Sequence, residues 1–484
     1  MFHMQFHPKS ASCASCNITY HSKEDSAYCG NSFTSAIVFV LFYIGMVNLN
    51  LRVVIIPQAF RDSSADRRNQ LLIAHLELER HQHIEDQVGM GRTADYPEIM
   101  DRNHIIYSLC DRYDSGFQFT DVKTVKTGSV KDQNKSGTCW SFSGTSFIED
   151  EIMRKGGPEL DLSEMFTVRH CYDDKADKYL RMDGKINFAQ GGGLWDIIYV
   201  LDNYGLVPEE AYSGLNYGED KHSHYELSDG LTGYLNGVLK NSNRRYSTAW
   251  KKGLDGILDA YLGPLPEKFT YNGKQYTPRT FADQFKLNPN DYICVTSFTH
   301  HPFYKAFPLE VADNWLWADY QNVPMEEMKA IVDNALENGY SVAWAADVSE
   351  GGFKWREGVA VIPEEIDPGT LEGTELSRWV QLSDKERAKK RFQFDGPVKE
   401  IVPTQEMRQQ AFDRHETTDD HGMTIVGIAT DQKGNRYYKI KNSWDTNQKY
   451  GGYFYCSEPY FLMKTMGIMV NKEAVPAAIA KKFK

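Results

Sequence analysis

A cysteine at the start of a predicted helix is the first residue of the chain that could do chemistry. After Cys139, apolar residues recur every three or four positions up to residue 153, and a Gly-Gly-Pro sequence follows at 156–158. This pattern predicts an amphipathic helix with Cys139 in its first turn. Unpaired backbone N–H groups and the positive end of the helix dipole favour a thiolate there, so we expect a lowered thiol pKa. Because most free cysteines are small buried hydrophobic residues, this interpretation requires a partner for the thiol.

Such a partner lies near the other end of the chain. His421 precedes a predicted β-hairpin whose strands cover residues 423–429 and 437–440, and Asn442 follows the second strand. The hairpin would return Asn442 to the side of His421, where its amide would fix the tautomer and the plane of the imidazole. Trp444 could shield that hydrogen bond from water. Thiol, imidazole and amide would then act as nucleophile, base and orienting group of a covalent catalytic site.

The composition is that of an ordinary globular protein. Of the 484 residues, 41% are hydrophobic, 13% aromatic and 25% charged, and 54 Lys and Arg against 66 Asp and Glu leave a net charge of −12. This balance excludes a disordered chain, a collagen and a small disulfide-rich protein, and the acidic excess argues against a nucleic-acid binder. The eight cysteines are too sparse for a disulfide framework. The length suggests about two to four structural units.

Residues 1–95 are predicted to form a leader that precedes the globular part. Cys13, Cys16 and Cys29 lack the second half of a regular zinc-ligand pattern, so an unstructured segment is favoured over a metal site. The apolar segment 36–56 begins with an unbroken apolar run of 12 residues, whereas a membrane-spanning helix needs about 20. An export signal, or upstream sequence that is not part of the native protein, is favoured over a membrane anchor, and membrane contact through this segment stays open.

Several sequence blocks resemble the papain-type cysteine peptidases. Gln133 precedes Cys139 by six residues, as the oxyanion-hole glutamine of that family precedes its nucleophile. The blocks follow the order of the family and cover roughly residues 117–215 and 410–470. Besides Gln133, the blocks are Ser136-Gly137-Thr138-Cys139-Trp140-Ser141-Phe142, Leu162-Ser163-Glu164, Gly191-Gly192-Gly193, the stretch Tyr204–Tyr212, His421, Asn442-Ser443-Trp444 and Gly451-Gly452-Tyr453.

The resemblance implies an α+β fold with two lobes, a helical lobe and a β-barrel-like lobe, and a large insert between the catalytic cysteine and histidine. The helical lobe with the nucleophile would cover residues 96–215, and the insert residues 216–400. The β lobe with the histidine and the asparagine, together with a short C-terminal tail, would cover residues 401–484.

The long stretch between Cys139 and His421 narrows the resemblance to one branch of the family. The surplus residues fall mainly between about 215 and 400, an arrangement similar to bleomycin hydrolase and bacterial aminopeptidase C. That branch implies a homo-oligomer, such as a hexamer, whose active sites face a shared interior. Within this stretch, apolar periodicity predicts a helix over 325–339 and a buried strand over 341–347.

Two features depart from the family. Ser136 stands where the family's common disulfide would have the partner of Cys171, and a free Cys171 favours a reducing compartment and therefore the cytoplasm. Export or anchoring through the segment 36–56 is the alternative. The branch usually has a C-terminal arm whose carboxylate meets the amino group of the substrate. Only eight residues follow Pro476, and their cationic side chains would repel an ammonium, so an endopeptidase, or another segment that blocks the cleft, is an open alternative.

The predicted activity is hydrolysis of peptide bonds through a thioester acyl-enzyme, by an aminopeptidase of the bleomycin hydrolase type. Peptides are the expected partners, and no metal or organic cofactor is required. Acyl transfer to amines, hydrolysis of small amides and a non-catalytic oligomeric peptide-binding shell are the competing functions. The resemblance assigns Gln133 to the oxyanion hole. It assigns substrate binding to Gly191, Gly192, Gly193 and Trp444.

Other polar clusters are expected to be structural. The pairs His222/His224 and His300/His301 lie in polar stretches without companion carboxylates at ligand spacing, so we expect no metal site there. The acidic residues 149–151 are expected on the solvated face of the helix that begins at Cys139. The aromatic-rich segment 303–317 is expected in the core of the insert or at a subunit interface.

Overall fold

A computed structural model of the protein describes residues 116–242 and 245–483. The predicted leader 1–95, with its apolar segment 36–56 and with Cys13, Cys16 and Cys29, lies outside the described residues. Among the helices that are described, none combines the length and the apolar character that crossing a membrane requires.

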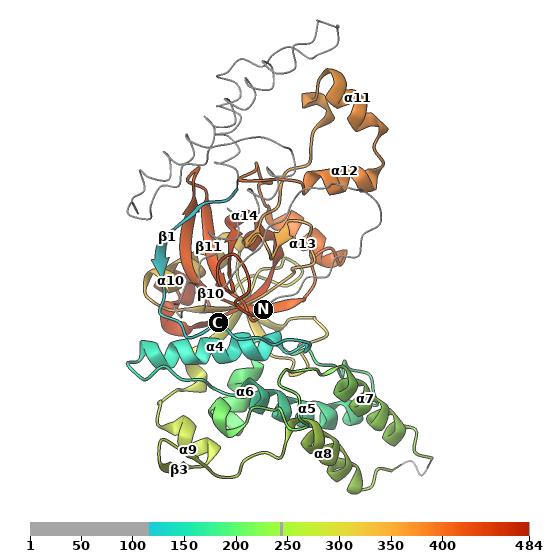
Figure 1. Cartoon of the computed structure of the whole chain (residues 1–484), viewed down its shortest axis with the longest axis vertical. Helices are drawn as coiled ribbons and strands as arrows, with labels where there is room; N and C mark the ends of the chain where they lie inside the picture. The colour runs from blue at the N-terminus through green and yellow to red at the C-terminus, as the bar shows by residue number, and fades with distance from the viewer. Residues whose placement is uncertain (1–115, 243–244, 484) are drawn as a thin grey trace, which may run out of the picture. The chain divides into compact units, whose positions relative to one another are not determined.

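A large mixed sheet forms the centre of the fold (Figure 1). Its strands are β1 Phe119–Thr124, β4 Tyr292–Thr296, β5 Ala306–Pro308, β6 Asp319–Asn322, β7 Val342–Ala346, β8 Phe353–Lys354, β9 Val359–Ala360, β10 His421–Asp431, β11 Arg436–Lys441, β12 Tyr453–Ser457 and β13 Thr465–Asn471. The order is β5-β6-β4-β13-β7-β10-β11-β12-β9-β8, with β1 paired to β10. Most neighbours are antiparallel, so the predicted hairpin is confirmed as β10 and β11. A separate small hairpin pairs β2 Phe269–Tyr271 with β3 Lys274–Tyr276.

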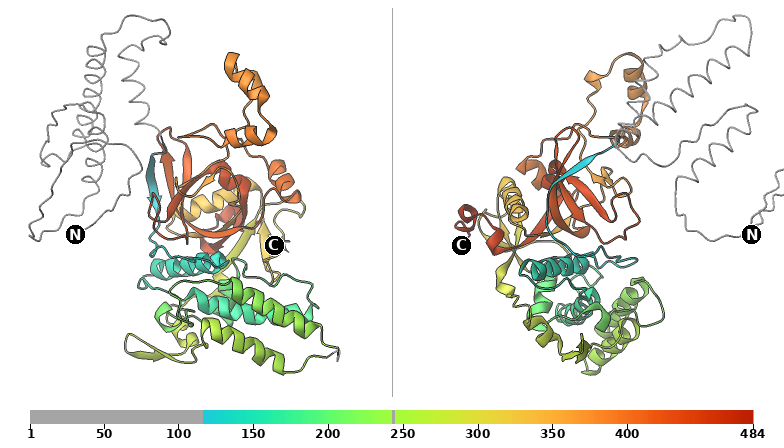
Figure 2. Two further views of the ribbon diagram at one scale, coloured as in Figure 1. Left: turned by 45° about the vertical axis from the view of Figure 1, so that its right-hand side comes forward. Right: turned by 60° about the vertical axis from the view of Figure 1, so that its left-hand side comes forward.

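One group of helices lies together at one end of the sheet (Figure 1). It consists of α4 Cys139–Arg154, α5 Glu164–Arg181, α6 Asp196–Asn203, α7 Tyr225–Leu239, α8 Ala249–Leu262 and α9 Pro278–Asp283. In each view, α4 lies between the sheet and the other helices of the group (Figure 2). The remaining helices are α10 Met325–Glu337, α11 Gly373–Gln381, α12 Asp384–Arg391, α13 Gln405–Asp413, α14 Glu458–Lys464 and α15 Ala477–Ala480.

The helix that begins at Cys139 is buried on nearly all sides. α4 contacts β10 and β7 on one side and α5 and α6 on another. The expectation that Glu149, Asp150 and Glu151 face solvent is therefore wrong, since none of the three is more than 3% exposed. Glu149 accepts a hydrogen bond from the backbone N–H of Leu162 (2.8 Å). Burial raises the pKa of Glu149 to about 7 and that of Asp150 to about 6.

The start of α4 lies directly against β10. A Cβ atom on Gly422 would stand 3.2 Å from the carbonyl oxygen of Cys139, which is tighter than ordinary packing, so glycine lets the strand approach the helix. A hydrogen bond supports the contact, because the hydroxyl of Ser143 donates to the carbonyl of Met423 (2.5 Å). His421, the first residue of β10, is thereby placed at the N-terminal end of the helix.

Residues 216–400, expected as an insert, are distributed over both parts of the structure. α7 and α8 join the apolar core around α5, whereas β4 and β7 pair with β13, and β7 pairs with β10. The predicted helix 325–339 and strand 341–347 are confirmed as α10 and β7. The boundaries of the expected insert stay a prediction, because its strands share one sheet with the strands of residues 401–484.

The last described residues pack against α10. Lys482 donates a hydrogen bond to the carboxylate of Glu327 (2.5 Å) and another to the hydroxyl of Tyr304 (3.3 Å). Phe483 is partly buried against the core that α10 shares with the sheet. Lys482 is thus held on this helix, and Phe483 on the core beside it.

Candidate active site

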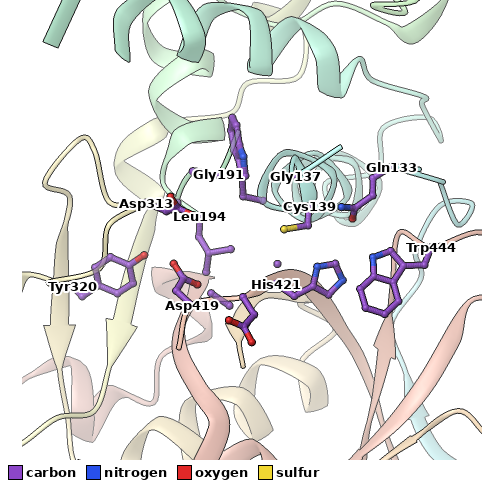
Figure 3. A pocket seen from close by; sticks show the side chains of 16 residues that line it. Gln133, Gly137, Cys139, Gly191, Leu194, Asp313, Tyr320, Asp419, His421 and Trp444 are labelled. Carbon is purple, nitrogen blue, oxygen red and sulfur yellow. The ribbon is translucent and has the colours of Figure 1, made fainter. Parts of the chain in front are cut away.

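A cavity of about 330 Å³ lies where the start of α4 meets the start of β10 (Figure 3). Of the site residues predicted from the sequence, all line this cavity except Asn442, which is buried behind His421. The structure therefore brings together residues from both ends of the chain. The lining residues are Gln133, Gly137, Cys139, Trp140, Gly191, Gly192, Gly193, Leu194, Asp313, Tyr320, Ala345, Asp419, Asp420, His421, Gly422 and Trp444.

His421 is held by two neighbours. Its Nε2 lies 2.7 Å from Oδ1 of Asn442, and this oxygen also accepts the backbone N–H of Ser443 (2.8 Å), which fixes the orientation of the amide. Because the oxygen can only accept, Nε2 of His421 carries a proton and Nδ1 is left for another partner. The indole of Trp444 covers the imidazole, with ring centroids 4.5 Å apart. His421 and Asn442 are both buried, so their hydrogen bond is shielded from water.

The thiol pKa differs from the expectation based on sequence. Burial raises the pKa of Cys139 to about 12, and the backbone N–H groups of Gly422 and Trp140, which act in the opposite direction, do not compensate for it. The expected lowering of the pKa by the helix start is therefore wrong for the isolated thiol. Burial likewise lowers the pKa of His421 to about 4. Burial therefore disfavours the charged form of each group, and pairing a thiolate with an imidazolium would offset part of this cost.

Gln133 is fixed by two hydrogen bonds. Its Oε1 accepts from the hydroxyl of Ser443 (2.7 Å), and its Nε2 donates to the carbonyl of Ser136 (2.8 Å). An amide nitrogen carries two hydrogens, so one N–H of Gln133 remains for a ligand. Gln133 lies beside Cys139 at the cavity (Figure 3). This side chain and the backbone N–H of Cys139 could together stabilise an oxyanion.

The segment 191–193 requires glycine where it passes the start of α4. A Cβ atom on Gly191 would stand 1.9 Å from Oδ2 of Asp313, and one on Gly192 would stand 2.7 Å from the indole of Trp140. A Cβ atom on Gly193 would meet nothing closer than 3.9 Å. Gly192 therefore lets the chain run close to the helix, and Gly191 leaves room for the carboxylate of Asp313. All three glycines leave this wall of the cavity without side chains.

Two family models match the chain. The model described as papain family cysteine protease matches residues 116–252, and the Peptidase C1-like family matches 266–362 and 393–484. Aminopeptidase C of Lactobacillus delbrueckii subsp. lactis is 24% identical over 413 residues, which cover 74% of this chain and 83% of that protein. The mitochondrial cysteine proteinase 1 of Saccharomyces cerevisiae (strain JAY291) is 21% identical over 416 residues, with 75% and 79% coverage. The chain belongs to the papain-type cysteine peptidases.

A solved structure shows the same fold for this papain-type peptidase. PepW from Lactobacillus rhamnosis HN001 superimposes with a TM-score of 0.57 at 19% identity, covering 88% of this chain and 95% of that one. The papain-like fold that the resemblance implied is thereby confirmed, and the structure combines helices with a mixed sheet. Within the family, the chain falls in the branch of aminopeptidase C and bleomycin hydrolase, as the long stretch between the two motif halves predicted.

One end of the peptidase cavity is acidic, which the sequence reasoning missed. Asp313 and Asp419 lie on one side of Cys139, whereas Gln133 and Trp444 lie on the other (Figure 3). Burial raises the pKa of Asp419 to about 7, and the neighbouring carboxylates add to this effect. The pair of acidic residues directly before the histidine was the one local signal. Nothing in the sequence connects Asp313 to it.

The histidine pair His300/His301 has a companion carboxylate after all. Glu310 lies 3.0 Å from Nε2 of His300 and 2.7 Å from Nε2 of His301, so the expectation that no carboxylate accompanies the pair is wrong. Within the described part of the chain, this is the one group of His, Cys, Asp and Glu side chains close enough to hold a metal ion. The hydrogen bonds inside the group satisfy these atoms, and none of the three residues lines the peptidase cavity.

Proposed function

We propose that this chain is a cysteine aminopeptidase in which Cys139, His421, Asn442 and Gln133 do the chemistry. The observation that carries the proposal is the convergence of these residues on one cavity, with His421 held by Asn442 at 2.7 Å. The names of the aminopeptidase C relatives support removal of N-terminal residues as the activity. Gly191, Gly192, Gly193 and Trp444 would bind the peptide.

The reaction would begin with a proton transfer inside the cavity. His421 takes the thiol proton on Nδ1, and Cys139 Sγ attacks the carbonyl carbon of the peptide bond. Since burial disfavours either charge alone, the transfer and the attack proceed as a coupled event in which the imidazolium balances the developing negative charge. The oxyanion accepts hydrogen bonds from Gln133 Nε2 and from the backbone N–H of Cys139.

The second half of the reaction returns the enzyme to its starting state. His421 gives its proton to the leaving amine, which departs and leaves a thioester between Cys139 Sγ and the acyl group. Water, deprotonated by His421, then attacks the thioester carbonyl. The C–S bond breaks, the carboxylic acid leaves, and the thiol regains its proton. Asn442 keeps the imidazole in one plane throughout.

The finer organisation of the chain belongs to the same proposal. A helical lobe would carry the nucleophile and a β lobe the histidine, and residues 216–400 would add family-specific elements to both. The free and buried Cys171, Cys294 and Cys456 support a reducing compartment, and thus the cytoplasm. A homo-oligomer is also proposed, and light scattering of the purified protein would test it.

The decisive experiment for the activity is mass spectrometry of products from a mixed peptide library. We expect products that have lost single N-terminal residues, and we expect N-acetylated copies of the same peptides to stay intact. Internal fragments would instead assign an endopeptidase. Absence of cleavage, together with absence of labelling of Cys139 by a thiol-directed probe near neutral pH, would favour the peptide-binding shell.

Replacing Gln133 by alanine should lower kcat by about 10²–10³-fold, as loss of one oxyanion donor does in other acyl-transfer enzymes. Because the contact strengthens only in the transition state, KM should change little. Ser443→Ala is the matched comparison. It removes one bond that orients Gln133 but keeps the donor, so its loss should be smaller. Steady-state kinetics of both variants test this, and equal losses would contradict the assignment.

A further inference from the structure

We infer that Asp419, assisted by Asp313, binds the α-ammonium group of the substrate and thereby selects free N-termini. The inference rests on the proposed aminopeptidase function and adds the residues that would confer the specificity. An aminopeptidase must recognise a cation next to the scissile bond. The ammonium nitrogen of an N-terminal residue is separated from the carbonyl carbon of that residue by one Cα atom, so its anionic partner must line the same cavity as the thiol.

The two carboxylates meet this requirement of position. Asp313 and Asp419 line the cavity that contains Cys139, on the side away from Gln133 and Trp444 (Figure 3). A peptide that placed its leaving group towards Trp444 would direct its amino end towards the carboxylates. The same end is bordered by the bare backbone of the glycine segment 191–193.

Asp313 is held in place at this end. Its Oδ1 accepts a hydrogen bond from the side chain of Asn187 (2.8 Å), and its Oδ2 occupies the space that a side chain at Gly191 would need. Lys175 attracts Asp313 electrostatically, but the ammonium of Lys175 donates its hydrogen bonds to backbone carbonyls of Ala189 (3.1 Å) and Gly191 (2.5 Å). Burial raises the pKa of Asp313, Lys175 and Asn187 oppose this rise, and Oδ2 is left at the wall of the cavity without a hydrogen bond from the described residues.

The carboxyl group of Asp419 has no partner among the described residues. Within the described residues its carboxylate makes no hydrogen bond and no ion pair, whereas the adjacent Asp420 accepts hydrogen bonds from Thr418 (2.7 Å) and from the backbone of Ser349 (3.2 Å). Burial, Asp313 and Asp420 all raise the pKa of Asp419. Such a site gains from a bound cation, because the cation offsets both the burial and the repulsion.

A substrate ammonium fits the site better than a metal ion. The carboxylates of Asp313, Asp419 and Asp420 are not grouped closely enough to share an ion. An ammonium group, in contrast, donates up to three separate hydrogen bonds and can reach two carboxylates at once. Of residues 477–483, none lines the cavity, and Lys482 is bonded to Glu327 of α10.

The test compares free and blocked N-termini in matched variants. The substrate is the aminoacyl aminocoumarin amide that the wild-type protein cleaves fastest, together with its N-acetyl form. For Asp419→Asn, we expect kcat/KM on the free amine to fall by about 10- to 100-fold, mainly through KM, because a charge-assisted bond is lost. Asp313→Asn should give a smaller loss. Asp319→Asn removes the same charge at an exposed position outside the cavity and should change neither value.

Further readouts separate recognition from a structural role. In Asp419→Asn the low rate on the acetylated substrate should not fall, and iodoacetamide should still alkylate Cys139 at the wild-type rate or faster. The melting temperature should not fall either. Because the folded state raises the pKa of Asp419 from 3.8 to about 7, ionisation costs the wild type stability as the pH rises from 4 to 7. The free energy of unfolding of Asp419→Asn should therefore exceed that of the wild type most above pH 7, and the two should not differ in this respect below pH 4.

The outcomes that would contradict the ammonium assignment differ from those that would contradict the proposed function. If the wild type prefers free N-termini and Asp419→Asn keeps that preference in full, the ammonium assignment is overturned while the aminopeptidase function stands. If the wild type itself cleaves both forms equally, or if Cys139→Ala retains activity, the proposed function fails first. A variant that loses activity on both substrates together with a lowered melting temperature would also overturn the assignment, in favour of a structural role.

Discussion

Replacing Cys139 by alanine is expected to reduce kcat by about 10⁶-fold, as loss of a catalytic nucleophile does in other peptidases. The variant cannot form the thioester, and the cavity holds no second thiol, since the other described cysteines are buried in the hydrophobic cores. The fold should be retained, because the thiol lies at a cavity wall and its removal leaves no void inside a hydrophobic core. Hydrolysis of the best peptide amide measures kcat, and a thermal melt measures stability.

The matched control for this variant is Cys171→Ala. Cys171 is 1% exposed in the apolar core around α5, so its replacement should lower the melting temperature through a small cavity while kcat stays within a few fold. A Cys139→Ala protein that still cleaved peptides at the wild-type rate in the presence of a metal chelator would refute the mechanism outright.

Replacing His421 by alanine is expected to cost nearly as much in kcat, about 10⁴–10⁶-fold, because thiol and imidazole act as a unit. The variant also shows how Cys139 ionises and reacts when no imidazole is present. Without the imidazole, the thiol of Cys139 has no base to take its proton, and burial raises its pKa, so little thiolate should be present at pH 7. Alkylation by iodoacetamide should then be slow and should rise about tenfold per pH unit between pH 7 and 10.

The wild-type protein should behave differently in the same alkylation assay. Since proton transfer to His421 forms thiolate and imidazolium together, its alkylation rate at pH 7 should be high and should change little towards pH 10. His301→Ala is the control histidine variant, because His301 bonds to Glu310 outside the cavity. Its alkylation profile should match the wild type. Identical profiles for His421→Ala and the wild type would show that His421 is not the base.

Much of the candidate site could be predicted from the sequence, because its helix start and its hairpin depend on residues close together in the chain. The apolar period after Cys139 predicted α4, and the alternation around a glycine turn predicted the hairpin that returns Asn442 to His421. Motifs of this kind encode local geometry, in which propensity and hydrogen bonding act over a few residues. The helix α10 and the strand β7 were predictable for the same reason.

The electrostatic properties of the site could not be predicted in this way. The polar residues 149–151 look like a solvated helix face, yet α4 is covered by strands on one side and by helices on another, and the carboxylates are buried. The same enclosure raises the pKa of Cys139 although its position in the helix favours a thiolate. Burial depends on which distant elements pack together, and no local pattern records it.

The sequence by itself determined the family, the candidate catalytic residues and the hairpin that aligns two of them. Only the tertiary structure decided which charges surround them. Asp313 lies more than one hundred residues from either Cys139 or His421 along the chain, and Glu310 meets His300 and His301 across a loop. Such juxtapositions arise from the packing of a sheet whose neighbouring strands are far apart in sequence. The strength of a charge in a cavity depends on that packing, because it sets both the distance to other charges and the exclusion of water.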